Sequence, residues 1–313
     1  MVEPESPSGG PLRDRPVANP SRTPLTGRAS GEKRSDRKAN PPSPSLMRRC
    51  FAETAGTALL IAVGLSIVIL DFGHGSPVAS VIKGVAARRA LTGFLFGATG
   101  MTVAISPLGR WSGAHINPVV TLAFLAERTM SSFEAFAYIA SQLVGAVLGS
   151  LPLLAWGQMG SSVAYGATYP GPAGVAAAFL GEVATTFVLI ISLLSFVSSS
   201  KVRRFTPLIF PPMYAVMVWL EAGFSGTSTN PARSLGPDVV GLDFRSYWLY
   251  VAAPVVGTAV ALVFRRFAPV LRDVEVDVAR VAHFEAARLD GFASSVRGSA
   301  IRAAFTSAKG AQE

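Results

Sequence analysis

Two near-identical tripeptides most constrain how this chain can fold: Asn117-Pro118-Val119 and Asn230-Pro231-Ala232, each inside a long apolar region. Asn is a favoured helix N-cap and Pro a favoured first helical residue, so each tripeptide predicts a helix start. A helix that starts inside a bilayer exposes backbone amides and the positive end of its dipole at that depth. Such backbone is tolerated only where it is buried in protein or lines a watery cavity. Two such starts therefore predict a pore.

The composition is that of an integral membrane protein. Of the 313 residues, 50% are hydrophobic and only 15% are charged, against roughly 25% charged in typical soluble domains. The net charge of +9 does not indicate a nucleic-acid partner, because the basic residues lie in the tails and short loops and no nucleic-acid-binding motif is found. A single cysteine, Cys50, excludes a disulfide framework within the chain.

Six apolar segments have about the 20 residues needed to cross a bilayer as a helix. They cover about 51–70, 88–108, 133–156, 174–198, 206–222 and 246–266. Two shorter segments, 117–126 and 231–240, each begin at or just after an Asn-Pro and are too short to span. We therefore expect them to form re-entrant half-helices.

The two halves of the chain repeat each other. Glu53 precedes Thr57 by four residues in the first span, and Glu182 precedes Thr186 in the same way in the fourth. Three spans per repeat is an odd number, so the repeats must have opposite orientations, with a shared site near the midplane. The predicted fold is an all-α membrane protein with six transmembrane helices plus two re-entrant half-helices in two inverted repeats, about 47–156 and 174–267.

Lys and Arg flank the spans mainly on one side, at 48–49, 199–205 and 265–266. The excess of positive charge in cytoplasmic loops places both termini in the cytoplasm, with Arg88 and Arg89 as an exception on the outer side. Residues 1–46 are expected to be a disordered, basic cytoplasmic tail. In the cytoplasmic tail 268–313, the apolar spacing from 272 to 292 fits an amphipathic helix, and a solvated tail is the alternative.

The segments SGAHINPVVT (112–121) and GTSTNPARSLGP (226–237) resemble the two signature loops of the aquaporin, or major intrinsic protein, family. The resemblance covers about residues 47–267. It implies six tilted helices, two half-helices that meet in mid-membrane, one pore per subunit and a homotetramer. The implied protein is a channel in the lipid bilayer without catalytic activity, cofactor or metal.

Candidate filter residues follow from the same comparison. An Arg inside the bilayer costs about 2.5–3.5 kcal/mol, so Arg233 is expected to face the pore. The resemblance implies that it is the arginine of the narrow aromatic/arginine filter, with Thr227, Val218 and Phe96 as the other members. Counting alone reaches Gly97 instead of Phe96, and Gly97 is kept as the fallback.

Three positions depart from common family patterns. Val218 stands where water-selective members often have His, which favours slightly larger neutral solutes, and some metalloid-passing plant channels have Val there. Ser234 stands where glycerol-conducting members usually have Asp, which argues the other way. Val119 replaces the usual Ala of the first motif, with an effect on packing or on pore width.

Glu53 and Glu182 are expected to hydrogen-bond the backbone of the re-entrant loops, and His115 to pack its own loop. A proton relay through one Glu is the alternative, opposed by the lack of a further carboxylate or His nearby in the spans. The expected function is a passive, proton-excluding channel for water, in a plasma or inner membrane. A facilitator for glycerol, peroxide or metalloid acids, a proton-coupled transporter and a non-conducting scaffold are the alternatives.

Overall fold

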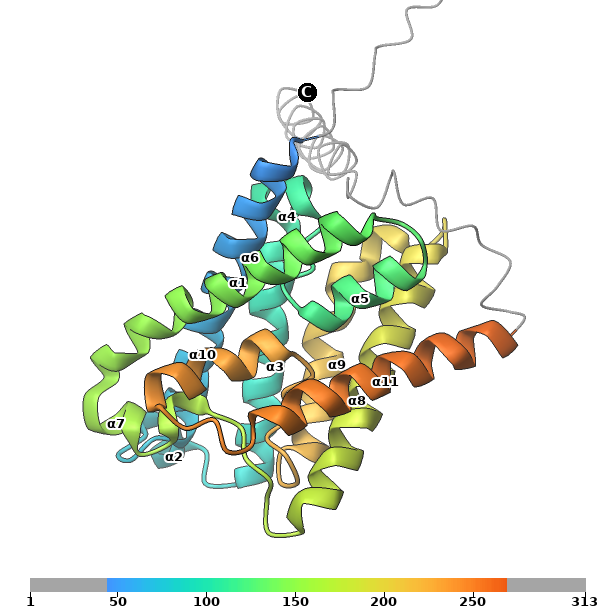
Figure 1. The fold of residues 1–313 in the computed structure, drawn as a ribbon. Helices are drawn as coiled ribbons and strands as arrows, with labels where there is room; N and C mark the ends of the chain where they lie inside the picture. Colours follow the sequence, from blue (N-terminus) through green and yellow to red (C-terminus); the bar gives the residue numbers. More distant parts are fainter. Residues whose placement is uncertain (1–43, 269–313) are drawn as a thin grey trace, which may run out of the picture. The chain divides into compact units, whose positions relative to one another are not determined.

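The structure is a computed structural model and describes residues 44–268. Residues 1–43 of the expected tail 1–46, and the expected amphipathic segment 272–292, lie outside these residues. The described part is helical, and its six long helices agree with the predicted spans within a few residues (Figure 1). They are α1 (Leu46–Phe72), α3 (Val85–Ile105), α6 (Ser132–Ser150), α8 (Gly174–Ser198), α9 (Thr206–Glu221) and α11 (Tyr247–Phe267).

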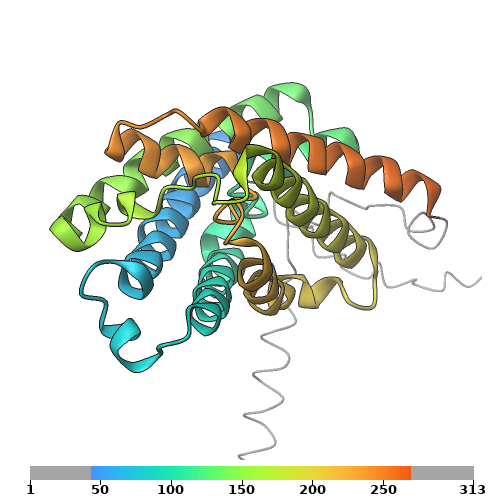
Figure 2. The ribbon, with the colours of Figure 1, turned by 90° about the horizontal axis from the view of Figure 1, so that it is seen from below.

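The two half-helices begin at the prolines of the tripeptides. They are α5 (Pro118–Ala126) and α10 (Pro231–Gly241). In Figures 1 and 2 they lie among the long helices. α5 packs against α6 and α11, and α10 packs against α6 and α11 as well as meeting α5.

Four of the described helices are long and apolar enough to cross a membrane by themselves. They are α1, α6 together with the turns that follow it (Ser132–Ser161), α8 and α11. The other two, α3 and α9, pack along each other. Gly93 and Gly97 of α3 allow this contact, since a Cβ atom on them would lie 2.2 Å from the Tyr214 carbonyl oxygen and 2.5 Å from that of Phe210. Small residues at such contacts allow helix backbones to approach closely in membranes.

The loops contain short helices that the sequence analysis did not predict. They are α2 (Pro77–Val81), α4 (Pro107–Ser112), α7 (Gly157–Ser161) and the 3₁₀ turns η1 (Leu151–Trp156), η2 (Ala164–Gly166) and η3 (Arg203–Phe205). The third predicted span continued to residue 156, but α6 ends at Ser150 and continues as η1. Pro152 explains this end, because proline lacks the backbone N–H that would continue the helix.

The structure gives Arg88 a local role. Its Nη1 donates to the Asp71 carbonyl oxygen at 2.5 Å, and its guanidinium lies 5.0 Å from the centre of the Phe72 ring. A cation at the last carbonyl groups of a helix satisfies an unpaired acceptor and interacts favourably with the helix dipole. Arg88 thus closes the end of α1, which accounts for one of the two basic residues that break the charge rule.

Candidate functional site

The loops that lead into α5 and α10 have the same unusual backbone. The residues four, three and one positions before each Asn all have positive φ: 88°, 49° and 42° at Gly113, Ala114 and Ile116, and 87°, 54° and 53° at the equivalent residues of the second loop, Gly226, Thr227 and Thr229. Positive φ is a genuine outlier for a β-branched residue. Strained conformations of this kind persist only where the surroundings enforce them, and they cluster at functional sites.

Two fully buried carboxylates hold these loops. Glu53 accepts hydrogen bonds from the backbone N–H groups of His115 (3.0 Å) and Ile116 (2.7 Å). Glu182 accepts from those of Ser228 (2.6 Å) and Thr229 (2.8 Å). The hydrogen bonds expected from the sequence are therefore present in both halves.

A second matched pair of contacts was not predicted. Tyr138 of α6 donates its hydroxyl to the Ser112 carbonyl oxygen at 2.9 Å, and Tyr250 of α11 donates to the Ser225 carbonyl oxygen at 2.7 Å. Each tyrosine comes from the third long helix of its repeat, and each acceptor lies five residues before the Asn. The two positions share no obvious local motif in the sequence, and only the symmetry of the fold reveals them.

The half-helices meet through their N-cap asparagines. Asn117 Nδ2 donates to the Thr229 carbonyl oxygen and Asn230 Nδ2 to the Ile116 carbonyl oxygen, both at 2.9 Å. Each Oδ1 caps its own helix by accepting from the N–H two residues on, at 3.0 Å in α5 and 2.9 Å in α10. These crossed hydrogen bonds join the two N-termini, so that the positive ends of both dipoles converge.

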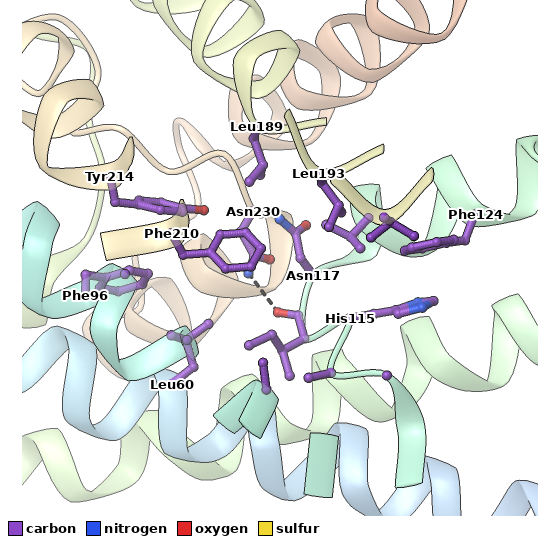
Figure 3. A pocket seen from close by; sticks show the side chains of 18 residues that line it. Leu60, Phe96, His115, Asn117, Phe124, Leu189, Leu193, Phe210, Tyr214 and Asn230 are labelled. Carbon is purple, nitrogen blue, oxygen red and sulfur yellow. Dashed lines mark hydrogen bonds between the residues drawn. The ribbon is translucent and has the colours of Figure 1, made fainter. Parts of the chain in front are cut away.

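A cavity extends from this junction, and its volume, including the part open to solvent, is about 700 Å³. Both asparagines line it, together with aromatic and aliphatic side chains (Figure 3). The lining residues are Leu60, Phe96, Gly97, Gly100, Ala104, Gly113, Ala114, His115, Ile116, Asn117, Val120, Phe124, Leu189, Leu193, Val197, Phe210, Tyr214 and Asn230.

His115 is fixed at one wall of this cavity. Its ring is stacked on Phe124 with the centroids 4.7 Å apart, and the Tyr138 ring lies edge-on to it at 5.1 Å. Its Nδ1 is 3.1 Å from the Thr121 hydroxyl oxygen. These contacts agree with the expectation that His115 packs its own loop.

Arg233, Val218 and Thr227 do not line this cavity. Arg233 is buried and donates from Nη1 to the Gly166 carbonyl oxygen at 2.7 Å. Phe96 instead lies beside Tyr214, with ring centroids 5.9 Å apart. The structure therefore places Phe96 and Gly97 with the asparagine pair, apart from the other three residues predicted for the filter.

The uncharged loop that follows α7 is fastened to α10 and its C-terminal end. The Gly166 carbonyl oxygen of this loop accepts from Arg233 of α10. The Thr168 hydroxyl of the loop lies 2.8 Å from the Ser234 hydroxyl of α10. Tyr169 donates to Asp243, which Arg245 also binds through Nε (2.9 Å) and Nη2 (2.6 Å). The hydrogen bonds from Arg245 lower the pKa of Asp243 below its usual range. Ser234 thus belongs to a buried hydrogen-bond network.

One expectation is wrong. The spans do contain a further carboxylate near the site, because Glu221 at the end of α9 is buried and accepts a hydrogen bond from the Thr227 hydroxyl. Asp238 of α10 is buried as well. Glu221 follows Val218 by three residues, so it lies on the same helix face as a predicted filter residue. That spacing is the signal in the sequence that points to Glu221.

Val119 is fully buried and is not among the residues that line the cavity. Ala232, its counterpart in the second motif, is fully buried too. The additional methyl groups of Val119 therefore pack against protein, so this departure from the usual motif affects packing and not the lining of the cavity.

A helical membrane protein with two half-helices joined N-terminus to N-terminus, and a cavity at the joint, has the architecture of a channel. The family model of the major intrinsic protein matches residues 41–264. The chain belongs to this family.

Relatives agree with this assignment. "Aquaporin NIP3-1" of Arabidopsis thaliana is 30% identical over 71% of this chain and 68% of its own length. "Glycerol uptake facilitator protein-like 6" of Lactiplantibacillus plantarum is 30% identical over 69% of this chain and 95% of its own. The aquaglyceroporin structure from Plasmodium falciparum shares the fold, with a TM-score of 0.58 and 20% identity over 73% of this chain and 99% of that one.

Proposed function

We propose that this chain forms a passive transmembrane pore that conducts water and excludes protons. The crossed hydrogen bonds of Asn117 and Asn230 carry the proposal. An Asn amide has two N–H donors, and each of these amides donates once to the opposite loop. One donor on each asparagine is then left for water in the cavity that both residues line.

Proton exclusion follows from this arrangement. A water molecule that accepts from both asparagines turns its hydrogens outward in opposite directions, which interrupts the hydrogen-bonded chain that would relay a proton. The converging dipoles of α5 and α10 add a positive potential that repels cations. Arg233 adds a full positive charge, and with Val218 and Thr227 it forms the proposed filter. Phe96 narrows the pore beside the asparagine pair.

The contacts of the buried glutamates Glu53 and Glu182 argue against coupled proton transport. Both carboxylate oxygens of Glu53 and both of Glu182 accept backbone N–H groups. Moving a proton through either group would release a strained loop. Glu221 does not supply a relay either, because its carboxylate accepts from the hydroxyl of Thr227, a residue of the proposed filter.

Conduction of small neutral solutes is the second candidate. Val218 in place of His removes a donor and some bulk from the proposed filter. Relatives of this chain include a protein named as a glycerol uptake facilitator, and one solved structure that shares the fold is named as an aquaglyceroporin. We therefore include glycerol, peroxide and metalloid acids such as boric or arsenous acid among the solutes to be tested.

The assembly and orientation complete the proposal. Basic residues at 48–49, 199–205 and 265–266 favour cytoplasmic termini, and the family resemblance favours a homotetramer in a plasma or inner membrane. Cross-linking of the purified protein would test the tetramer, and protease accessibility of the termini in oriented vesicles would test the orientation.

Stopped-flow light scattering on proteoliposomes tests the function. Shrinkage in an impermeant osmolyte measures water permeability, and re-swelling in glycerol or boric acid measures solute permeability. Shrinkage no faster than in protein-free vesicles would reject a water channel. If re-swelling occurs and is lost in Val218→His, the chain is also a solute facilitator whose selectivity depends on this position.

A further inference from the structure

Glu221 is a buried carboxylate for which the proposed pore has no role so far. It is the last residue of α9 and is 6% exposed. Its Oε2 accepts a hydrogen bond from the Thr227 hydroxyl. Its Oε1 has no hydrogen-bond partner among the described residues. A buried charged group with so few partners is costly, so its presence calls for an explanation.

The fold makes room for this carboxyl group. A Cβ atom on Gly181 of α8 would lie 2.4 Å from Glu221 Oε1, so the absence of a side chain at Gly181 leaves the space that this oxygen occupies. Glu182, the next residue along α8, holds the backbone N–H groups of the same loop. Two carboxylates therefore hold the second loop: Glu182 binds its backbone N–H groups and Glu221 binds the Thr227 side chain.

The first loop shows that the second carboxylate is not needed to form the loop. Ala114 occupies the position of Thr227, three residues before its Asn, and has φ of 49° against 54° for Thr227. Alanine has no hydroxyl, and the same backbone forms without such a hydrogen bond. The pair of Glu221 and Thr227 occurs only in the half that carries Arg233. This asymmetry indicates a role in selectivity rather than in folding.

The chemical consequence concerns the one donor of Thr227. A hydroxyl group has a single O–H, and that of Thr227 is used by a carboxylate that is itself buried. It cannot donate to a passing solute at the same time. The proposed filter then offers its donors from Arg233, and Val218 contributes an apolar side chain to it.

We propose that Glu221 is a positioning residue that withdraws the Thr227 hydroxyl from the pore, and that this favours small neutral solutes with carbon-bound hydroxyl groups relative to water. The inference rests on the proposed channel function and on the place of Thr227 and Val218 in the filter. If Glu221 no longer accepts from the Thr227 hydroxyl, this hydroxyl turns to the pore and makes the wall of the filter more polar. Water gains from this change, and a solute with a carbon skeleton loses apolar contact.

The test is the ratio of glycerol to water permeability in proteoliposomes. This ratio does not depend on how much folded channel each vesicle contains, so a purely structural defect leaves it unchanged. Glu221→Leu should lower the ratio about threefold or more, the scale of one hydrogen bond. Glu221→Gln keeps an oxygen acceptor in a side chain of the same shape, and should leave the ratio at the wild-type value.

The double variant Thr227→Val with Glu221→Leu provides the decisive comparison. It replaces a buried polar pair by an apolar pair of similar shape, which is often nearly neutral for stability. Because it also presents no hydroxyl to the pore, its ratio should return to the wild-type value. It also provides the test if Glu221→Leu alone does not fold.

The failures of the two proposals are distinguishable. Wild-type vesicles no more permeable to water than protein-free ones would reject the channel function. A wild type that conducts water but no glycerol would reject the inference alone. So would a ratio that is unchanged or raised in Glu221→Leu, that falls equally in Glu221→Gln, or that stays shifted in the double variant.

Discussion

Replacing Glu182 by Leu should strongly destabilise the channel. Its carboxylate accepts from the Ser225 hydroxyl at 2.7 Å as well as from the N–H groups of Ser228 and Thr229. Leucine has a similar size but no acceptor, so two backbone N–H groups remain buried without a partner. Each such group costs about 1–3 kcal/mol, which gives about 2–6 kcal/mol for Glu182→Leu.

Thermal unfolding of the purified protein in detergent, followed by tryptophan fluorescence, measures this loss. At about 2–4 °C per kcal/mol for a protein of this size, the midpoint should fall on the order of 10 °C. Glu53→Leu should behave similarly, because Glu53 also holds two backbone N–H groups and accepts from Gln142 at 2.8 Å.

Glu134→Gln is the matched control for the loss of a carboxylate. Glu134 pairs with Arg49 at 2.6 Å, and its side chain is 27% exposed. Glu134 also forms a capping box with Ser131 at the start of α6. Glutamine can take the same role in a capping box. An ion pair of this kind contributes about 0–1 kcal/mol. If Glu182→Leu unfolds at the same temperature as Glu134→Gln, the carboxylate does not hold the loop as argued.

Four further substitutions test packing and the pore. Gly149→Val should abolish folding of the channel, because a Cβ atom there would lie 2.3 Å from the Ala58 carbonyl oxygen of α1. Gly100→Ala should be tolerated, because the atom nearest to its added Cβ would be 3.9 Å away. Size-exclusion profiles in detergent compare the two variants. Val119→Ala should lower the unfolding midpoint, reflecting about 1.6 kcal/mol for two buried carbon groups, without changing water permeability per channel. Asn230→Asp should reduce water permeability in proteoliposomes, since it replaces the donor to the Ile116 carbonyl by an acceptor and adds a negative charge; wild-type permeability would contradict the role of the asparagine pair.

The membrane fold could be predicted from the sequence because its signals are local. Span length and apolarity are properties of single segments, and an N-cap Asn followed by Pro fixes where α5 and α10 begin. The end of α6 was missed although Pro152 marks it, because a long apolar run outweighed one residue. The short helix α4 was also missed, since its six residues carry little periodic signal.

The site was predicted less completely because much of it depends on contacts between distant segments. The buried Glu pair could be found from a repeated spacing. The contact of Glu221 with Thr227 depends on how the loop folds back on α9, which spacing alone does not determine. The place of Phe96 depends on the packing of α3 against α9. The sequence left Phe96 and Gly97 as the two candidates for this filter position, and both line the cavity at the asparagine pair.

The symmetry of the two loops separates folding from selectivity. The loops share their backbone angles, the glutamate that holds them and the tyrosine that anchors them. These shared features build the junction at which the asparagines meet.

The side chains of the two loops differ. Ala114, His115 and Ile116 precede the first Asn, where the cavity is largely apolar, and three hydroxyl residues precede the second, in the half that carries Arg233. Changes at the shared positions should therefore affect how much channel folds, measured by its unfolding midpoint. Changes confined to the second loop and its Glu221 should alter which solutes pass, measured by a permeability ratio. A substitution at a shared position that changed the ratio but not the midpoint would contradict this division.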